Sequence, residues 1–124
     1  MPATSGGTII TPPSTADTKS SWVQLADATT APIHALMVLA QGTSSDMSGS
    51  FYKLDIAVGA AGAETVVISD HMFEISSSEE MRAYTPEFYP LSFNIPSGVR
   101  LAARCSALTA SSSAVEVAVY GFTY

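Results

Sequence analysis

The sequence predicts an all-β protein, an antiparallel β-sandwich of the jelly-roll kind with an extended N-terminal arm. Segments in which apolar residues alternate with other residues recur at spacings of about 8–15 residues, with turn residues between them. Only 13% of the 124 residues are charged, whereas Ser and Thr number 18 and 12, which disfavours long helices with a charged solvent face. Because alternation gives each sheet one apolar face, two sheets must cover each other.

Residues 1–21 are expected to lie outside a single domain of residues 22–124. This segment is rich in Gly, Pro, Ser and Thr, and Ile9 and Ile10 are its main apolar side chains. Such a composition buries too little apolar area to offset the entropy of ordering. Two interpretations stay open: a free tail, or an arm that becomes ordered on a neighbouring subunit with Ile9 and Ile10 as anchors.

Seven or eight strands are predicted after this segment, and seven of them can be placed. In the clearest one, residues 51–58, Tyr52, Leu54 and Ile56 share a buried face, while Lys53 and Asp55 share a wet face with Ala57. The other six cover residues 22–26, 33–40, 64–72, 89–95, 99–105 and 115–120. Residues 33–40 are almost entirely apolar, as in a strand covered on both faces. Residues 75–86 are compatible with a short helical turn or a loop.

Several single residues refine this pattern. Pro90 cannot donate to a strand ladder, which indicates a strand start or a sheet edge. Pro96-Ser97-Gly98 predicts a tight turn, because Gly readily adopts a positive φ. Trp22, the one tryptophan, is expected in the core, and Cys105 shares the parity of its strand's buried positions.

Charge and hydropathy exclude several classes of function. The formal net charge is −6 and the pI is about 4.5, so a polyanion such as a nucleic acid would be repelled, and so would an anionic membrane. No segment has the pattern of a signal peptide, and the longest apolar run, residues 31–40, falls short of the ~20 residues of a spanning helix. We expect neither nucleic acid nor a membrane as a direct partner.

Groups that could perform catalysis are few. His34 and His71 are the only imidazoles, whereas a metal site needs three or four convergent ligands. Asp70 and His71 are adjacent on a predicted strand and therefore point to opposite faces. No serine lies in a G-x-S-x-G motif. We therefore expect no enzyme, no metal and no cofactor, and a small cupin-like metal enzyme is the weakest alternative.

Arginines and aromatic residues instead favour protein–protein contacts. Arg100 and Arg104 share one face of a strand, from which they could pair with carboxylates of another subunit. Phe88, Tyr89 and Phe122 belong to a set of aromatic residues too large for a core of this size, and such residues suit a buried contact with another chain.

The same aromatic residues also allow a second hypothesis. Aromatic rings stack on sugar rings, and jelly rolls often serve as lectin domains. In a carbohydrate- or receptor-binding module of this kind, Tyr84, Tyr89 and Asp70 would line the site.

Half of the chain resembles small β-sandwich structural proteins of tailed bacteriophages. The likeness is carried by the strand TVVI at 65–68, the hairpin FNIPSGVRLAARC at 93–105 and the final strand VEVAVYGF at 115–122. The hairpin matches the pattern I-P-x-G-x-R-[LI]-A-x-R at Ile95, Pro96, Gly98, Arg100, Leu101, Ala102 and Arg104.

This resemblance implies a virion component that is assembled in the host cytoplasm. It implies above all a capsid decoration (cement) protein, which forms a homotrimer and binds the major capsid protein or other virion subunits. A module of a phage tail or fibre is the alternative. The residues expected at the subunit contacts are Ile9, Ile10, Phe88, Tyr89, Arg100, Arg104 and Phe122.

Overall fold

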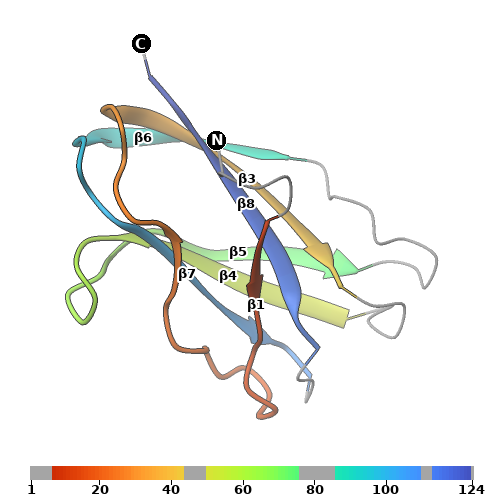
Figure 1. Ribbon diagram of the computed structural model, residues 1–124. Coiled ribbons are helices and arrows are strands. Elements are labelled where there is room, and N and C mark those ends of the chain that lie inside the picture. The colour runs from red at the N-terminus through yellow and green to blue at the C-terminus, as the bar shows by residue number, and fades with distance from the viewer. Residues whose placement is uncertain (1–6, 44–49, 76–85, 110–112, 124) are drawn as a thin grey trace.

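The computed structural model describes residues 7–43, 50–75, 86–109 and 113–123, which form two layers of antiparallel strands (Figure 1). In these ranges the strands are β1 (Thr8–Ile10), β2 (Val23–Ala26), β3 (Ile33–Gly42), β4 (Ser50–Val58), β5 (Thr65–Ile75), β6 (Glu87–Ile95), β7 (Leu101–Ala107) and β8 (Val115–Phe122). One sheet has the order β1-β8-β3-β6 and the other β2-β7-β4-β5.

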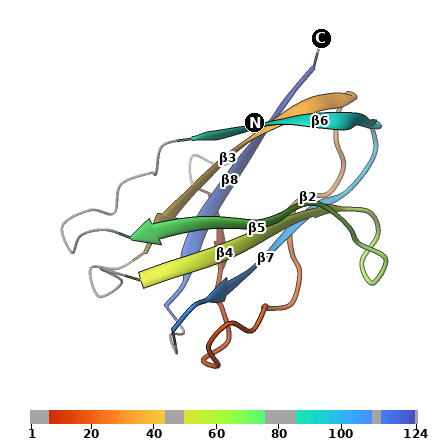
Figure 2. The same ribbon diagram turned by 180° about the vertical axis from the view of Figure 1, so that it is seen from behind.

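The strand pairing is that of a jelly roll. β1 pairs with β8, β2 with β7, β3 with β6, and β4 with β5, and every pair is antiparallel. This nested pairing arises when one long antiparallel ribbon is rolled into two stacked sheets. The view from behind shows β6 in one layer and β5 with β4 in the other (Figure 2). The predicted β-sandwich is confirmed.

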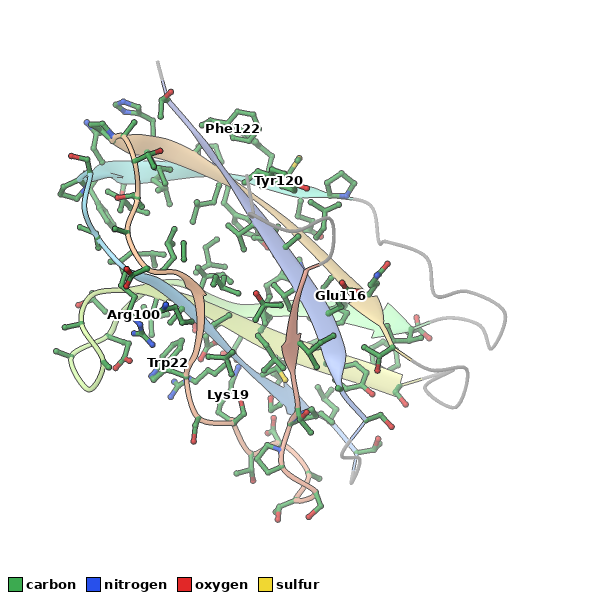
Figure 3. The ribbon with its side chains drawn as sticks, viewed as in Figure 1. Lys19, Trp22, Arg100, Glu116, Tyr120 and Phe122 are labelled. Atoms are coloured by element: carbon green, nitrogen blue, oxygen red, sulfur yellow. The ribbon has the colours of Figure 1, made fainter. Side chains whose placement is uncertain are left out.

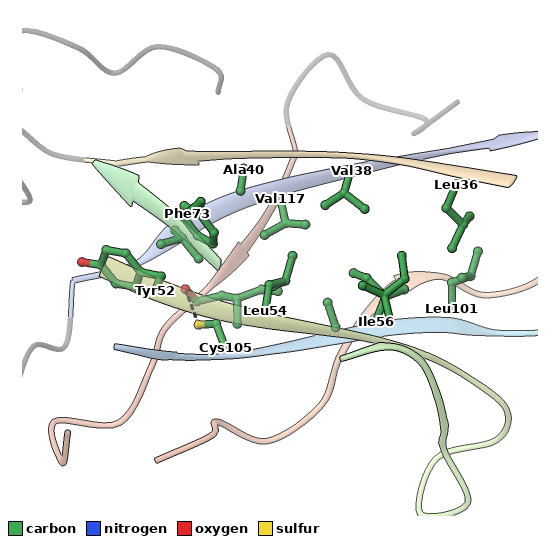
Figure 4. Packing of buried hydrophobic residues seen from close by; sticks show 14 of the residues in the cluster. Leu36, Val38, Ala40, Tyr52, Leu54, Ile56, Phe73, Leu101, Cys105 and Val117 are labelled. Atoms are coloured by element: carbon green, nitrogen blue, oxygen red, sulfur yellow. Dashed lines mark hydrogen bonds between the residues drawn. The ribbon is translucent and has the colours of Figure 1, made fainter. Parts of the chain in front are cut away.

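The core lies between the layers and follows the predicted alternation. Leu54 and Ile56 of β4 are completely buried and face Val38 and Leu36 of β3, and Tyr52, also completely buried, stacks on Phe73 of β5 (Figure 4). Cys105 is buried in the same cluster, as its parity predicted. Removing this apolar surface from water, at about 25 cal/mol per Å², is the main force that holds the two sheets together.

The pairing of β6 departs from simple alternation. Phe93 is 50% exposed, although Leu91, two residues before it in the predicted strand 89–95, is partly buried against the core. The register of β3 and β6 shifts here, because Ile33 lies opposite Ile95 whereas Ala35 lies opposite Pro90. Alternation is lost across such an irregularity. Pro90 lies on an edge strand as predicted, and Gly98 has a φ of 78° in its predicted turn.

The N-terminal segment corrects the predicted domain boundary. Residues 7–21 pack against the sandwich, and β1 pairs with residues 115–117 of β8. Ile10 is completely buried in the core of its own chain, so its predicted role as an anchor on a neighbour is wrong. A strand of three residues is too short to produce an alternation signal. The ambiguous segment 75–86 lies, but for its two ends, outside the described residues.

Candidate functional site

The outer surfaces of the two sheets differ in chemistry. The outer side of the β1-β8-β3-β6 sheet, here named the apolar face, presents Ile9, Met37, Leu39, Phe88, Pro90, Ala118, Tyr120 and Phe122, while Ala35 on the same side is covered by its neighbours. The four strands contain no Lys or Arg, and Glu87 and Glu116 are their carboxylates.

Strand register brings the aromatic residues of the apolar face together. Met37 lies opposite Phe88 of β6 on one side and opposite Tyr120 of β8 on the other. Residues directly opposite in antiparallel strands point to the same side of the sheet. The rings of Phe88 and Phe122 meet edge to face, with centroids 5.4 Å apart. The two residues are nevertheless 56% and 40% exposed.

β3 explains why this face is unusual. Leu36, Val38 and Ala40 point into the core, whereas Met37 and Leu39 point outward and keep part of their surface exposed. The strand therefore has the composition of one that is buried on both sides, but its own chain buries only one side fully. Contiguous exposed apolar side chains of this size mark binding surfaces on folded proteins.

The one outward carboxylate of the apolar face lies at an end of it. Glu116 accepts a hydrogen bond from the backbone N–H of Gly7 at 2.6 Å and another from Nε2 of Gln41. Ile9, which lies opposite Glu116, is 52% exposed. The central rows of the face, from Leu39 to Phe122, are free of charge.

The outer side of the β2-β7-β4-β5 sheet is here named the charged face. Asp55 lies at its centre. The face is defined by Asp17, Lys19, Trp22, Lys53, Asp55, Asp70 and Arg104. The Asp55 carboxylate accepts hydrogen bonds from Nζ of Lys19 at 3.0 Å, Nε of Arg104 at 2.9 Å and the backbone N–H of Asp70 at 2.9 Å. Burial opposes ionisation of Asp55, but these three donors outweigh it and hold its pKa below the usual 3.8.

Residues 17–22 lie across the charged face and are held there by side-chain contacts. Lys19 reaches Asp70 at 2.8 Å, Lys53 reaches Asp17 at 2.9 Å, and the Trp22 ring lies 4.4 Å from the Arg104 guanidinium carbon. In Figure 3 Lys19, Trp22 and Arg100 gather beside β7, away from Tyr120 and Phe122.

This covering segment corrects two predictions. Asp55 and Ala57 were expected on a wet face, but they are 3% and 0% exposed. The backbone N–H of Ser20 donates a hydrogen bond to the backbone carbonyl of Cys105 at 2.8 Å, so the segment follows the edge of β7. Trp22 is half-buried on the outer side of the sheet, not in the core.

Both arginines of the predicted contact are paired within the chain. Nη1 of Arg100 lies 3.0 Å from the Glu64 carboxylate, and Arg104 binds Asp55. The interpretation that they meet carboxylates of another subunit stays a prediction, now for two side chains that already have carboxylate partners within the chain. Their partners lie 36 and 49 residues away in the sequence, and local patterns carry no information about such register.

Tyr89 closes the seam between β5 and β6 and does not face outward. Its hydroxyl lies 2.5 Å from Nδ1 of His71 and donates to Glu87 at 3.1 Å. Burial lowers the pKa of His71, and burial together with Glu87 raises the pKa of Tyr89 to about 12. Tyr89 is thus engaged within the chain, against its predicted place at a subunit contact.

The predicted sugar site is not assembled. Asp70 points to Lys19 on the charged face, whereas His71, its neighbour on β5, points inward to Tyr89. The prediction that Asp70 and His71 point to opposite faces is confirmed, and Asp70 and Tyr89 do not converge. Tyr84 lies outside the described residues.

Nucleophiles and metal ligands are sparse in the part of the chain that the structure describes. No three His, Cys, Asp or Glu side chains gather there in a way that could hold a metal ion. His34 lies on β3 and His71 on β5, in different sheets. Burial raises the pKa of Cys105 to about 12, so its thiol stays neutral. Within the described ranges no helix has the length and hydropathy to cross a membrane.

Fold and surfaces together define a jelly-roll protein with one apolar and one charged outer face. No protein-family model matches the chain, and no curated protein matches it. Among solved structures it is similar to a chain of infectious bursal disease virus, Gx strain, at a TM-score of 0.42 and 13% identity, over 93% of this chain and 31% of that one. A Gt-strain chain gives a TM-score of 0.35 and 11% identity, over 93% and 33%. The chain spans about a third of the length of those virus chains.

Proposed function

We propose that the protein is a non-catalytic structural subunit of a virus particle that joins other virion subunits through the apolar face. The observation that carries this proposal is the uncharged row Phe88, Met37 and Tyr120 across β6, β3 and β8, in which Phe88 is exposed and the other two are partly exposed. Covering such a surface removes apolar area from water and needs no charged partner. The resemblance of the sequence to small structural proteins of tailed bacteriophages supports the proposal that the protein acts in a virus particle.

The finer form of the proposal is a decoration protein on a phage head. In this form the subunits form a homo-oligomer, a trimer by resemblance, and bind the major capsid protein. The three long strands β6, β3 and β8, at ~4.8 Å spacing and eight residues at ~3.3 Å rise, give the apolar face roughly 380 Å². Specific interfaces bury about 800 Å² per partner, so the face alone supports a concentration-dependent association that further contacts strengthen on a particle.

The test compares the mass in solution of the wild-type chain, a double phenylalanine variant of the apolar face and a single phenylalanine variant of the other sheet. Light scattering over rising concentration is expected to show oligomers of the wild-type chain, whereas the double variant Phe88→Ser with Phe122→Ser stays monomeric. Phe51→Ser, which changes an exposed phenylalanine on the outer side of the other sheet, serves as the control. A wild-type chain that remains a monomer at millimolar concentration, and that binds no virus particle, would contradict the proposal.

A carbohydrate- or receptor-binding module of a phage tail or fibre is the second candidate. It is favoured by one observation, the proximity of Phe88, Tyr120 and Phe122 on one exposed face. Exposed aromatic rings can stack on sugar rings. Binding to a glycan array that is lost in Tyr120→Ser and kept in Phe51→Ser would favour this candidate over the first.

A further inference from the structure

β1 covers only part of the strand beside which it lies. β1 pairs with residues 115–117 of β8, whereas β3 pairs with β8 along residues 115–122. Within the ranges that the structure describes, no strand lies beside the other edge of β8 beyond Val117. A strand edge of this kind presents backbone N–H and C=O groups that can pair with another extended chain.

A cleft of about 190 Å³ lies beside this same stretch of β8. Its walls come from β8, β2 and residues 28–31, and the buried side chains of Ile33, Leu101 and Val117 contribute to its lining. None of its lining residues is charged. An engineered apolar cavity of ~150 Å³ accommodates a benzene ring, so this cleft has room for one or two aliphatic side chains.

The edge and the cleft are arranged as parts of one site. Ile10 of β1, opposite Val115, points inward and is completely buried. A strand that continued along β8 would likewise place every second side chain inward, over Val119 and Gly121, which line the cleft. A Cβ atom at Gly121 would approach Ile33 Cδ1 to 2.5 Å, so the Ile33 side chain packs directly over Gly121 at this end of the cleft.

We propose that this edge and cleft bind an extended segment of another protein chain, which adds a strand antiparallel to β8 and inserts an aliphatic side chain into the cleft. The uncharged lining and the backbone edge together select an uncharged segment with aliphatic residues at inward positions, as in β1 itself. The proposal concerns a different surface from the apolar face and does not depend on the proposed function.

The test uses the full chain and a synthetic peptide with the sequence of residues 7–11, blocked at both ends. Amide hydrogen exchange is measured with and without excess peptide. Exchange is expected to slow at least tenfold at those amides of residues 118–122 that point away from β3, with no change in β4. Absence of slowing at millimolar peptide would overturn the proposal, and so would slowing confined to other strands.

Two exposed threonines provide a matched pair of variants. Thr30 lines the cleft, whereas Thr15 lies in the turn region before β2, and both are exposed, so either accepts a glutamate without loss of the fold. Thr30→Glu is expected to weaken peptide binding at least tenfold, because it brings a carboxylate to a cleft whose lining carries no charge. Thr15→Glu makes the same change in charge and is expected to leave binding unaltered. Equal effects of the two would overturn the proposal.

A chain that begins at Gly7 separates an external partner from the chain's own first six residues. If an external strand is the occupant, the shortened chain and the full chain show the same exchange at residues 118–122 without peptide. Protection in the full chain that disappears on shortening would assign the edge to residues 1–6 of the same chain and overturn the proposal.

Discussion

β3 and β4 are inner strands of the two sheets. The outward-pointing side chains of β4 are covered by the same chain, whereas those of β3 are not fully covered. On β4, Asp55 is 3% exposed because cations and a covering segment of the same chain lie over it. On β3, Met37 and Leu39 are neither charged nor fully covered. Alternation distinguishes the core side of a strand from its outer side, but it does not reveal whether the outer side meets water, the same chain or another chain.

The two outer faces differ in what they stabilise: the charged face stabilises the fold, and the apolar face is available for association. The charged face contributes to folding, since every contact of Asp55 forms within the chain. The apolar face contributes less to folding, because Phe88 and Phe122 remain 56% and 40% exposed. Changes on the first face should therefore alter stability, and changes on the second should alter association.

The largest expected effect is that of Asp55→Ala. The change leaves Lys19, Arg104 and the Asp70 N–H without their shared acceptor. Breaking such a pair in a buried position costs about 3 kcal/mol, the lower part of the known range, because both cations can turn towards water. Urea unfolding followed by Trp22 fluorescence measures the loss. Asp27→Ala, at an exposed carboxylate, should stay within about 0.5 kcal/mol of wild type.

The apolar face should respond in the opposite way. Phe88→Ser with Phe122→Ser removes one edge-to-face contact, worth about 1 kcal/mol to stability. Association should fall at least tenfold, as measured by sedimentation at several concentrations, because the same rings would be buried by a partner. A double variant that unfolds readily yet associates normally would reverse the roles of the two faces.

His71, which lies between β5 and β6, makes the free energy of unfolding depend on pH. Burial lowers the pKa of His71 below 6.5, so the unfolded chain takes up a proton at a higher pH than the folded chain. The free energy of unfolding should therefore be highest above pH 6.5 and fall with acidification, by at most about 1.4 kcal/mol per pH unit. His71→Asn should flatten this slope between pH 6.5 and 5, and an unchanged slope would assign it to other groups.

The smallest expected effect concerns the exposed pair of the charged face. Lys53 binds Asp17, whose side chain is 62% exposed, and water and salt screen such a pair strongly. Lys53→Gln should therefore lower the free energy of unfolding least of the changes named here at low salt, and less still in 1 M NaCl, where the Debye length is about 3 Å. The self-association of the apolar face should not weaken in the same salt. Parallel losses in both would show that charge also holds the apolar contact.

The sequence predicts the sandwich because most of its strands are long enough to alternate. β4 and β7 bury the residues that their periodicity selects, Leu54 and Cys105 among them. β1 is missed because three residues carry no period, and because the fate of Ile10 depends on β8, more than a hundred residues away.

The candidate site is predictable only in part, for the same reason. Phe88 and Phe122 are exposed neighbours, but their proximity requires that β6 and β8 both lie beside β3. Arg104 shows the converse: its wet face is predicted, whereas the Asp55 carboxylate and the Trp22 ring that occupy it depend on register and on the course of residues 17–22.

Hydroxyl-radical footprinting of the assembled and the dissociated chain tests the division between the two faces most directly. Two matched pairs of side chains are available. Met37 and Phe88 lie on the apolar face, and their counterparts Met72 and Phe51 lie on the outer side of the other sheet. Assembly should reduce labelling of Met37 and Phe88 and leave Met72 and Phe51 as reactive as before. Protection of Met72 and Phe51, with Met37 and Phe88 still labelled, would contradict the assignment of the apolar face as the assembly surface.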